Sequence, residues 1–87
     1  MAQEKQRPDR AWIEKKVREV VGANLQVAAD EVKDEDNFVY DLGADSLDLT
    51  ELAAALEEEF GIEIPESEFN RVMTVSRVAD YVESQLQ

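Results

Sequence analysis

The sequence predicts an all-α domain: a four-helix bundle of three long helices and one short helix, with a long structured loop between the first and second helices. Three observations favour this class. Apolar residues recur every three or four positions in three separate segments, and no segment alternates with the period of two that is typical of a strand. The chain has 87 residues and an apolar share of 44%, which suffices for the core of one small domain.

The first helix is predicted over residues 12–22. Its apolar residues fall on one helical face: Ile13, Val17, Val20 and Val21. Gly22 stands where a left-handed C-terminal cap belongs. Residues 1–10 are polar, contain Pro8 and show no period, so we expect a disordered N-terminal arm there and the folded domain over residues 11–87.

The connection that follows, residues 23–45, has no sustained helical period, and compact domains rarely keep a loop of this length without a use. Apolar residues are spread along it: Leu25, Val27, Val32, Phe38, Val39 and Leu42. They predict that the loop is held against the bundle. Its last residues lead directly to Ser46, so a rigid loop would deliver a hydroxyl to the start of the next helix.

The second helix, residues 46–60, has the strongest pattern and is followed by Gly61; its apolar positions are Leu49, Leu52, Ala53, Leu56 and Phe60. Pro65 suits the N-terminal edge of a short third helix around residues 66–71, where Phe69 and Val72 can face inward. Thr74 is the expected cap of the last helix. The apolar stripe of that helix is Val75, Val78, Ala79, Val82 and Leu86.

The charge balance excludes several classes of protein. The chain holds 21 acidic residues against 9 Lys and Arg, a formal net charge of −12, which repels nucleic-acid phosphates and anionic membrane surfaces and favours basic partners. It has no Cys and no His, so disulfides, thiolate zinc sites and the usual general base are excluded, which argues against an ordinary hydrolase. The longest apolar run has five residues, 52–56, far below the roughly 20 of a transmembrane helix.

Ser46 at the start of the second helix is the candidate functional residue. A serine in this position is most often a plain N-cap. Asp45 can take that role, however, which leaves the Ser46 hydroxyl free, and a phosphate ester there would be favoured by the unpaired amides and the positive end of the helix dipole. A catalytic serine fits poorly, because the G-x-S-x-G elbow would need glycine at Ala44 and Asp48 and no His is present to take the proton.

The acidic residues are concentrated near this serine. Between Lys33 and Arg71 there are 13 acids and no basic residue. A helical projection places Leu47, Glu51, Ala54 and Glu58 on one outward stripe of the second helix, with Asp48 and Glu59 on its margin. The stripe is either a solvated surface or a docking face for a basic partner, in which Leu47 is a small apolar anchor inside a charged rim.

These residues resemble those of a known family. The segment Asp41-Leu42-Gly43-Ala44-Asp45-Ser46-Leu47-Asp48, followed by Glu51-Leu52 and Leu56-Glu57-Glu58-Glu59-Phe60, is similar to the acyl carrier proteins of type II fatty acid synthesis. The likeness covers roughly residues 12–84. The chain departs from the usual pattern of the family at Tyr40, Thr50, Ala54 and Phe69.

The resemblance implies that Ser46 receives a 4′-phosphopantetheine arm from coenzyme A, transferred by a separate Mg²⁺-dependent phosphopantetheinyl transferase, the holo-carrier synthase. The thiol of the arm would carry acyl groups as thioesters, so the protein itself is not an enzyme. The expected partners are basic-patch ketosynthases, reductases, dehydratases and acyltransferases, which would meet the candidate docking residues Asp45, Leu47, Asp48, Glu51 and Glu58. The acyl chain is expected between the helices, and the protein is expected to be a cytoplasmic monomer.

Two other interpretations compete with this one. An EF-hand loop that begins at Asp34 would place Val39 where glycine is required, and one that begins at Asp41 would place Ser46 there. No metal site is therefore expected, although weak association of Ca²⁺ or Mg²⁺ with the acidic stretch stays open. The second alternative is an acidic helical adaptor that binds a basic protein without a prosthetic group, with Ser46 as a simple cap.

Overall fold

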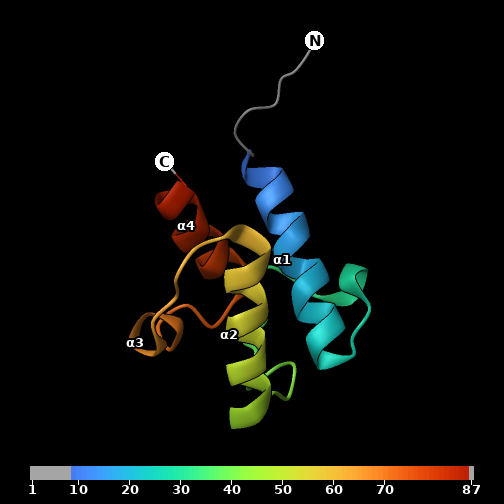
Figure 1. Cartoon of the computed structure of the whole chain (residues 1–87). Helices are drawn as coiled ribbons and strands as arrows, with labels where there is room; N and C mark the ends of the chain where they lie inside the picture. The colour runs from blue at the N-terminus through green and yellow to red at the C-terminus, as the bar shows by residue number, and fades with distance from the viewer. Residues whose placement is uncertain (1–8, 87) are drawn as a thin grey trace.

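The computed structural model describes residues 9–86 and confirms the all-α prediction (Figure 1). Its elements are α1 (Arg10–Leu25), the 3₁₀ turn η1 (Ala29–Glu31), α2 (Ser46–Phe60), α3 (Glu66–Phe69) and α4 (Val75–Leu86). The three long helices pack around one core, and the short α3 lies beside α2, away from α1. None of the described helices is both long and apolar enough to span a membrane.

The core is formed by the apolar stripes that the sequence predicts. Its fully buried side chains come from all three long helices and from the loop: Ile13, Val17, Val21, Phe38, Leu52, Leu56, Val75, Val78, Ala79 and Val82. The predicted stripe of α4 is wrong only at its end, because Leu86 is 38% exposed. Leu86 is the last residue of α4, where the helix extends beyond the buried core.

Helix α1 begins two residues earlier than predicted. Asp9 is its N-cap and accepts a hydrogen bond from the amide of Trp12, and Arg10 is its first residue. These two residues therefore do not belong to the predicted arm; the remainder of that arm, residues 1–8, lies outside the described residues. The Arg10 guanidinium reaches α4, where it pairs with Asp80 at 2.7 Å and Glu83 at 3.1 Å.

The Arg10 side chain also pairs with Glu14 at 2.8 Å within α1. The hydrogen bond to Asp80 contributes most to raising the pKa of the guanidinium above its ordinary value; desolvation lowers it by less, and the bonds to Glu14 and Glu83 add to the rise. The earlier start of α1 is thus stabilised by a cap and by ion pairs with carboxylates far along the chain.

The prediction that Gly22 ends α1 is wrong. The helix continues to Leu25, and Gln26 adopts the left-handed cap conformation with φ of 60°. Gly22 is buried inside the helix, where the chain folds back over it: the Val27 amide donates to the Gly22 carbonyl at 2.9 Å. A Cβ on residue 22 would lie 2.5 Å from the Val27 carbonyl oxygen, so glycine is required here for close backbone approach.

The loop between α1 and α2 is held against the bundle, as predicted. Val32 and Phe38 are buried, and Leu25, Val27 and Leu42 pack on the core. Val39 is the exception, since it is only partly buried and is not part of this packing. Two backbone hydrogen bonds attach the loop to the segment around the start of α4: Phe38 donates to the Met73 carbonyl at 2.9 Å, and Ser76 donates to the Asp34 carbonyl at 3.0 Å.

Asn37 organises the last part of this loop. Its side-chain oxygen accepts hydrogen bonds from the amides of Val39 and Tyr40, both at 2.9 Å. Its backbone carbonyl accepts from Asp41 and Leu42, and its own amide donates to the Asp41 carboxylate at 2.7 Å. The loop therefore reaches α2 as a closed, hydrogen-bonded turn.

The short third helix and the cap of the fourth helix are confirmed. Pro65 directly precedes α3, whose last residue, Phe69, is buried. Thr74 accepts a hydrogen bond from the Arg77 amide through its hydroxyl oxygen at 3.2 Å, as expected for the N-cap of α4. The connection between α2 and α3 is held by Glu57, whose carboxylate accepts from the Ile64 amide at 2.8 Å.

Candidate functional site

The start of α2 is capped by Asp45, as the sequence predicts. Asp45 has extended backbone angles, and its carboxylate accepts a hydrogen bond from the Asp48 amide at 2.9 Å. The Asp48 carboxylate accepts in return from the Asp45 amide at 3.1 Å, which completes a capping box. Gly43 turns the chain into the cap with φ of 78°, a left-handed value that favours glycine.

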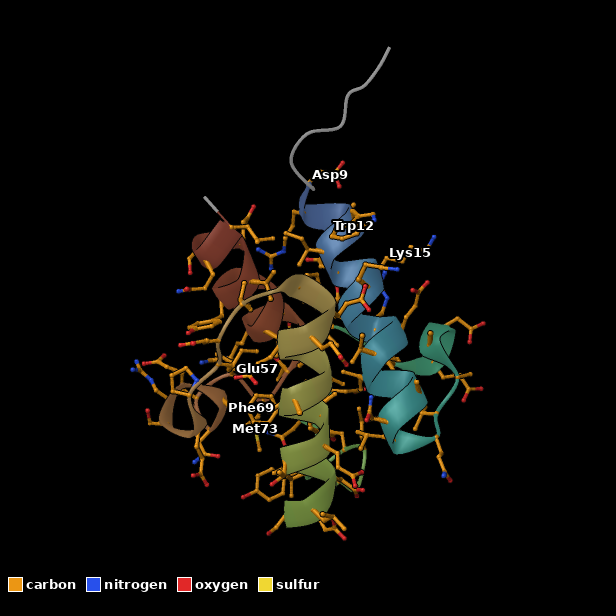
Figure 2. All side chains as sticks on the ribbon, viewed as in Figure 1. Asp9, Trp12, Lys15, Glu57, Phe69 and Met73 are labelled. Carbon is orange, nitrogen blue, oxygen red and sulfur yellow. The ribbon has the colours of Figure 1, made fainter. Side chains whose placement is uncertain are left out.

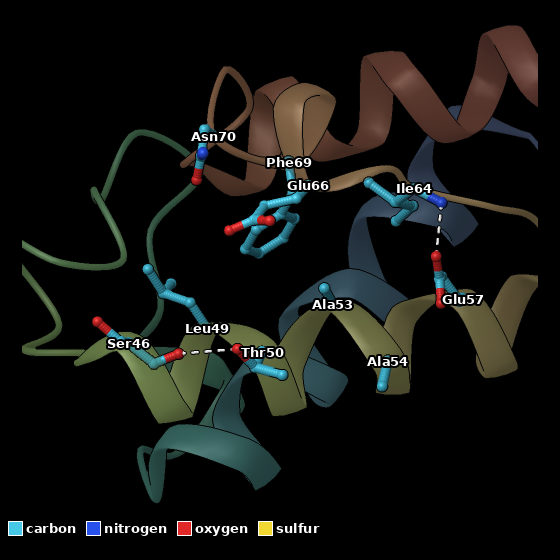
Figure 3. Close-up of a pocket in the computed structure, with 10 residues that line it drawn as sticks. All are labelled: Ser46, Leu49, Thr50, Ala53, Ala54, Glu57, Ile64, Glu66, Phe69 and Asn70. Carbon is cyan, nitrogen blue, oxygen red and sulfur yellow. Dashed lines mark hydrogen bonds between the residues drawn. The ribbon is translucent and has the colours of Figure 1, made fainter.

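Ser46 is the first residue of α2 and is exposed. Its backbone carbonyl accepts a hydrogen bond from the Thr50 hydroxyl at 3.1 Å, which Figure 3 shows as a dashed line. The Ser46 hydroxyl itself makes no hydrogen bond to any protein group within residues 9–86. Since the cap is supplied by Asp45, this hydroxyl is available for modification, and a negatively charged phosphate ester on it would lie at the positive end of the helix dipole.

The outward stripe of α2 is exposed, as the helical projection predicts. Leu47 is 65% exposed, and Glu51, Ala54 and Glu58 are exposed along the same helix. Asp45 is also exposed, whereas Asp48 is half-buried and spends one carboxylate oxygen on the capping box. All five candidate docking residues thus lie on or beside one accessible face, and Asp48 is the least exposed of the four acids.

A cavity of about 470 Å³ lies between α2 and α3 and reaches Ser46 (Figure 3). Its apolar lining consists of Leu49, Ala53, Ala54, Ile64 and Phe69. Its polar lining consists of Ser46, Thr50, Glu57, Glu66 and Asn70. Figure 2 shows Glu57 and Phe69 in the space between the two helices. The exposed hydroxyl therefore lies beside a cavity whose lining is half apolar and half polar.

Sequence reasoning singled out Ser46 and the outward stripe of α2 and expected an acyl chain between the helices, but it did not predict which residues line the cavity. Thr50, Ala54 and Phe69 are departures from a family pattern, and all three line the cavity. Glu66 and Asn70 were not singled out at all. Their position depends on how α3 is placed against α2, and no local spacing in the sequence carries that information.

Comparison with known proteins defines the class. The family model described as "Phosphopantetheine attachment site" matches residues 15–82, which span the capping box, Ser46 and the cavity. The protein is therefore a carrier with a phosphopantetheine prosthetic group. The free hydroxyl at a helix N-terminus fits such a group, because attachment there requires no protein hydrogen bond to be broken.

The similar proteins are carriers of one particular kind. Over 70 residues the chain is 51% identical to the acyl carrier protein of Nitratidesulfovibrio vulgaris strain DP4, a match that covers 80% of this chain and 92% of that protein, and the Hildenborough strain gives the same values. The solved structure of the acyl carrier protein from Enterococcus faecalis matches with a TM-score of 0.74 and 33% identity, covering 90% of this chain and 99% of that one. The chain belongs to the acyl carrier protein family.

Proposed function

We propose that Ser46 is the residue to which the phosphopantetheine group is attached. The observation that carries the proposal is the division of roles at the start of α2: Asp45 supplies the cap, and Ser46 presents an exposed hydroxyl with no partner among the described groups. The attached group supplies a terminal thiol on which acyl groups are carried as thioesters.

The chemistry of attachment is a phosphoryl transfer from coenzyme A. The Ser46 oxygen forms a bond to the phosphorus that bears pantetheine, the pyrophosphate bond of coenzyme A breaks, and adenosine 3′,5′-bisphosphate leaves. The hydroxyl proton passes to a base of the transferase. The role of the chain is to hold the hydroxyl in the open, at a helix terminus that favours the new negative charge.

Partner enzymes are proposed to dock on the stripe formed by Asp45, Leu47, Asp48, Glu51 and Glu58. The net charge of −12 steers basic surfaces toward the protein, and Leu47, 65% exposed, provides an apolar contact beside the modified serine. Holo-carrier synthase and enzymes of fatty acid synthesis that bear basic patches fit this surface. We propose that the protein meets these enzymes in the cytoplasm.

The cavity between α2 and α3 is proposed to shelter the acyl chain. It begins beside Ser46, where the carrier arm is attached, and its middle part is apolar. Burying an alkyl chain there removes apolar surface from water at both the chain and the cavity wall, which stabilises the loaded state by roughly 0.8 kcal/mol for each enclosed methylene.

The attachment residue is tested by mass spectrometry. Incubation with coenzyme A and a broad-specificity phosphopantetheinyl transferase should raise the intact mass by one phosphopantetheinyl group. Ser46→Ala should abolish the gain and keep the helical circular dichroism spectrum, because the hydroxyl has no structural hydrogen bond. A control variant, Ser67→Ala, removes an exposed serine of α3 and should be modified like the wild type. An unmodified wild type beside a second carrier that is modified would refute the proposal and favour the adaptor alternative.

The docking stripe is tested by charge reversal. Glu51→Lys or Glu58→Lys should weaken binding to a basic ketosynthase or to the transferase by about tenfold at low salt, since an attractive contact becomes a repulsive one. Glu31→Lys changes the net charge by the same amount on η1, away from the stripe, and should have a smaller effect. Equal losses in all three variants would show that only the overall charge matters.

A further inference from the structure

Among the described residues that line the cavity, Phe69 is the one aromatic side chain and the largest group. It is the last residue of α3 and is only 3% exposed. Figure 3 shows its ring directed from α3 into the space above α2, where Ala53 presents only a methyl group. At this point the bulk in the wall of the cavity comes from α3 and not from α2.

The ring is fixed in this position by the core behind it. Phe38, which is fully buried, stacks on Phe69 with ring centroids 6.2 Å apart and an interplanar angle of 25°. Phe38 is itself held by the hydrogen bond from its amide to the Met73 carbonyl. Because closely packed interiors resist displacement of large side chains, Phe69 cannot swing toward the core to make room for a longer ligand.

The cavity follows α2 for a limited distance. Its lining on that helix runs from Ser46 to Glu57, eleven positions that correspond to about 16 Å at the rise of an α-helix. At this end of the cavity the Glu57 carboxylate accepts a hydrogen bond from the Ile64 amide, and both residues belong to the lining. A chain that enters beside Ser46 meets the Phe69 ring, which lines the cavity from α3 and has the buried Phe38 behind it.

We infer that Phe69 is a specificity-determining residue that sets the longest acyl chain the cavity encloses. The inference rests on the proposed use of the cavity for the acyl chain. A smaller side chain at position 69 opens the space in front of Phe38 and lengthens the cavity, so longer chains become enclosed. With Phe69 in place, the cavity encloses only shorter acyl chains, and the methylenes beyond that length stay in water.

The experiment loads each variant with a series of acyl groups, from butyryl to hexadecanoyl, using acyl-coenzyme A and a broad-specificity phosphopantetheinyl transferase. The quantity measured is the Tm of the acylated protein minus the Tm of the holo form of the same variant. In the wild type this difference should rise by several degrees for each added pair of enclosed methylenes and then stop rising.

In Phe69→Ala and Phe69→Leu the rise should continue to longer chains than in the wild type. Phe69→Leu keeps most of the core volume, so it provides a folded variant if the alanine variant unfolds. Phe60→Leu is the matched control: it makes the same change at a buried phenylalanine that packs edge-on against Trp12 and does not line the cavity, so its rise should stop at the wild-type length.

A rise that stops at the same chain length in Phe69→Leu and in the wild type would overturn the inference while leaving the carrier function intact. The absence of any rise in the wild type would overturn it too, because the acyl chain would then lie outside the cavity. A wild type that accepts no acyl-coenzyme A at all would instead refute attachment at Ser46, and with it everything that depends on the attached group.

Discussion

Replacing Gly22 with alanine provides a sharp test of how α1 packs, because two physical effects of opposite sign compete. Alanine is a better helix former than glycine by about 1 kcal/mol in a helix interior. The new Cβ, however, would lie 2.5 Å from the Val27 carbonyl oxygen and 3.3 Å from the Ala29 amide nitrogen. Both are backbone atoms, so they cannot move aside by changing a side-chain rotamer.

The steric effect should win. Overpacking that forces a backbone shift costs roughly 1–3 kcal/mol, and a shift of residues 27–29 weakens the hydrogen bond from the Val27 amide to the Gly22 carbonyl, 2.9 Å long, which contributes about 1 kcal/mol. After the gain in helix propensity is subtracted, we expect Gly22→Ala to lower the free energy of unfolding by about 1–3 kcal/mol. That corresponds to a fall in Tm of roughly 4–8 °C for each kcal/mol in a domain of this size.

The assay is thermal and urea unfolding followed by circular dichroism. The control is Ala23→Gly at the next position, which is exposed and should lose about 1 kcal/mol from helix propensity alone. Gly22→Ala and Ala23→Gly, which are opposite exchanges at adjacent positions, should therefore both destabilise the protein. A Gly22→Ala variant as stable as the wild type, or more stable, would show that the chain after α1 does not cross as close to residue 22 as described.

Two further predictions concern contacts that hold the fold around the site. Asn37→Ala removes the acceptor for two loop amides and should lower the free energy of unfolding by about 1–3 kcal/mol. The amides of Val39 and Tyr40 should then exchange hydrogen faster than in the wild type. Unchanged exchange at these two amides would contradict the role of Asn37. Arg10→Gln removes ion pairs to three carboxylates, two of them on α4, and should lower the free energy of unfolding by about 1 kcal/mol. Because these groups are partly exposed, the difference in Tm from the wild type should shrink at about 1 M salt, where the Debye length is about 3 Å. A difference in Tm that persists at this salt concentration would mean that packing of the side chain matters more than its charge.

The sequence predicted those parts of the fold that depend on local pattern. The stripe from Val75 to Val82 and the Asp45 cap arise from helical spacing and from side-chain chemistry within one turn, so neighbouring residues were sufficient to predict them. The predictions that proved wrong concern residues whose role depends on contacts with residues further along the chain. Gly22 has the composition of a cap, but its role is set by the path of residues 27–29 after the helix has ended.

The candidate site also has one part that local sequence predicts and one part that it does not. Ser46 and the exposed stripe of α2 follow from one helix and its first turn. The cavity requires the position of α3, a helix of only four residues, which is determined by Phe69 packing on Phe38 from another part of the chain. Ala54 and Thr50 could therefore be noted as unusual in the sequence, but the surface they help to form could not be derived from it.

The capping box at the start of α2 separates the covalent state of the protein from its folding. If Ser46 were the cap, every change at its oxygen would remove a hydrogen bond from the first turn, and the unmodified, modified and loaded proteins would differ in the stability of α2. With Asp45 and Asp48 bonded to each other's amides, the first turn is complete without the serine. On the proposal that Ser46 carries the prosthetic group, the hydrogen bonds of this turn are therefore the same in the unmodified, modified and loaded proteins.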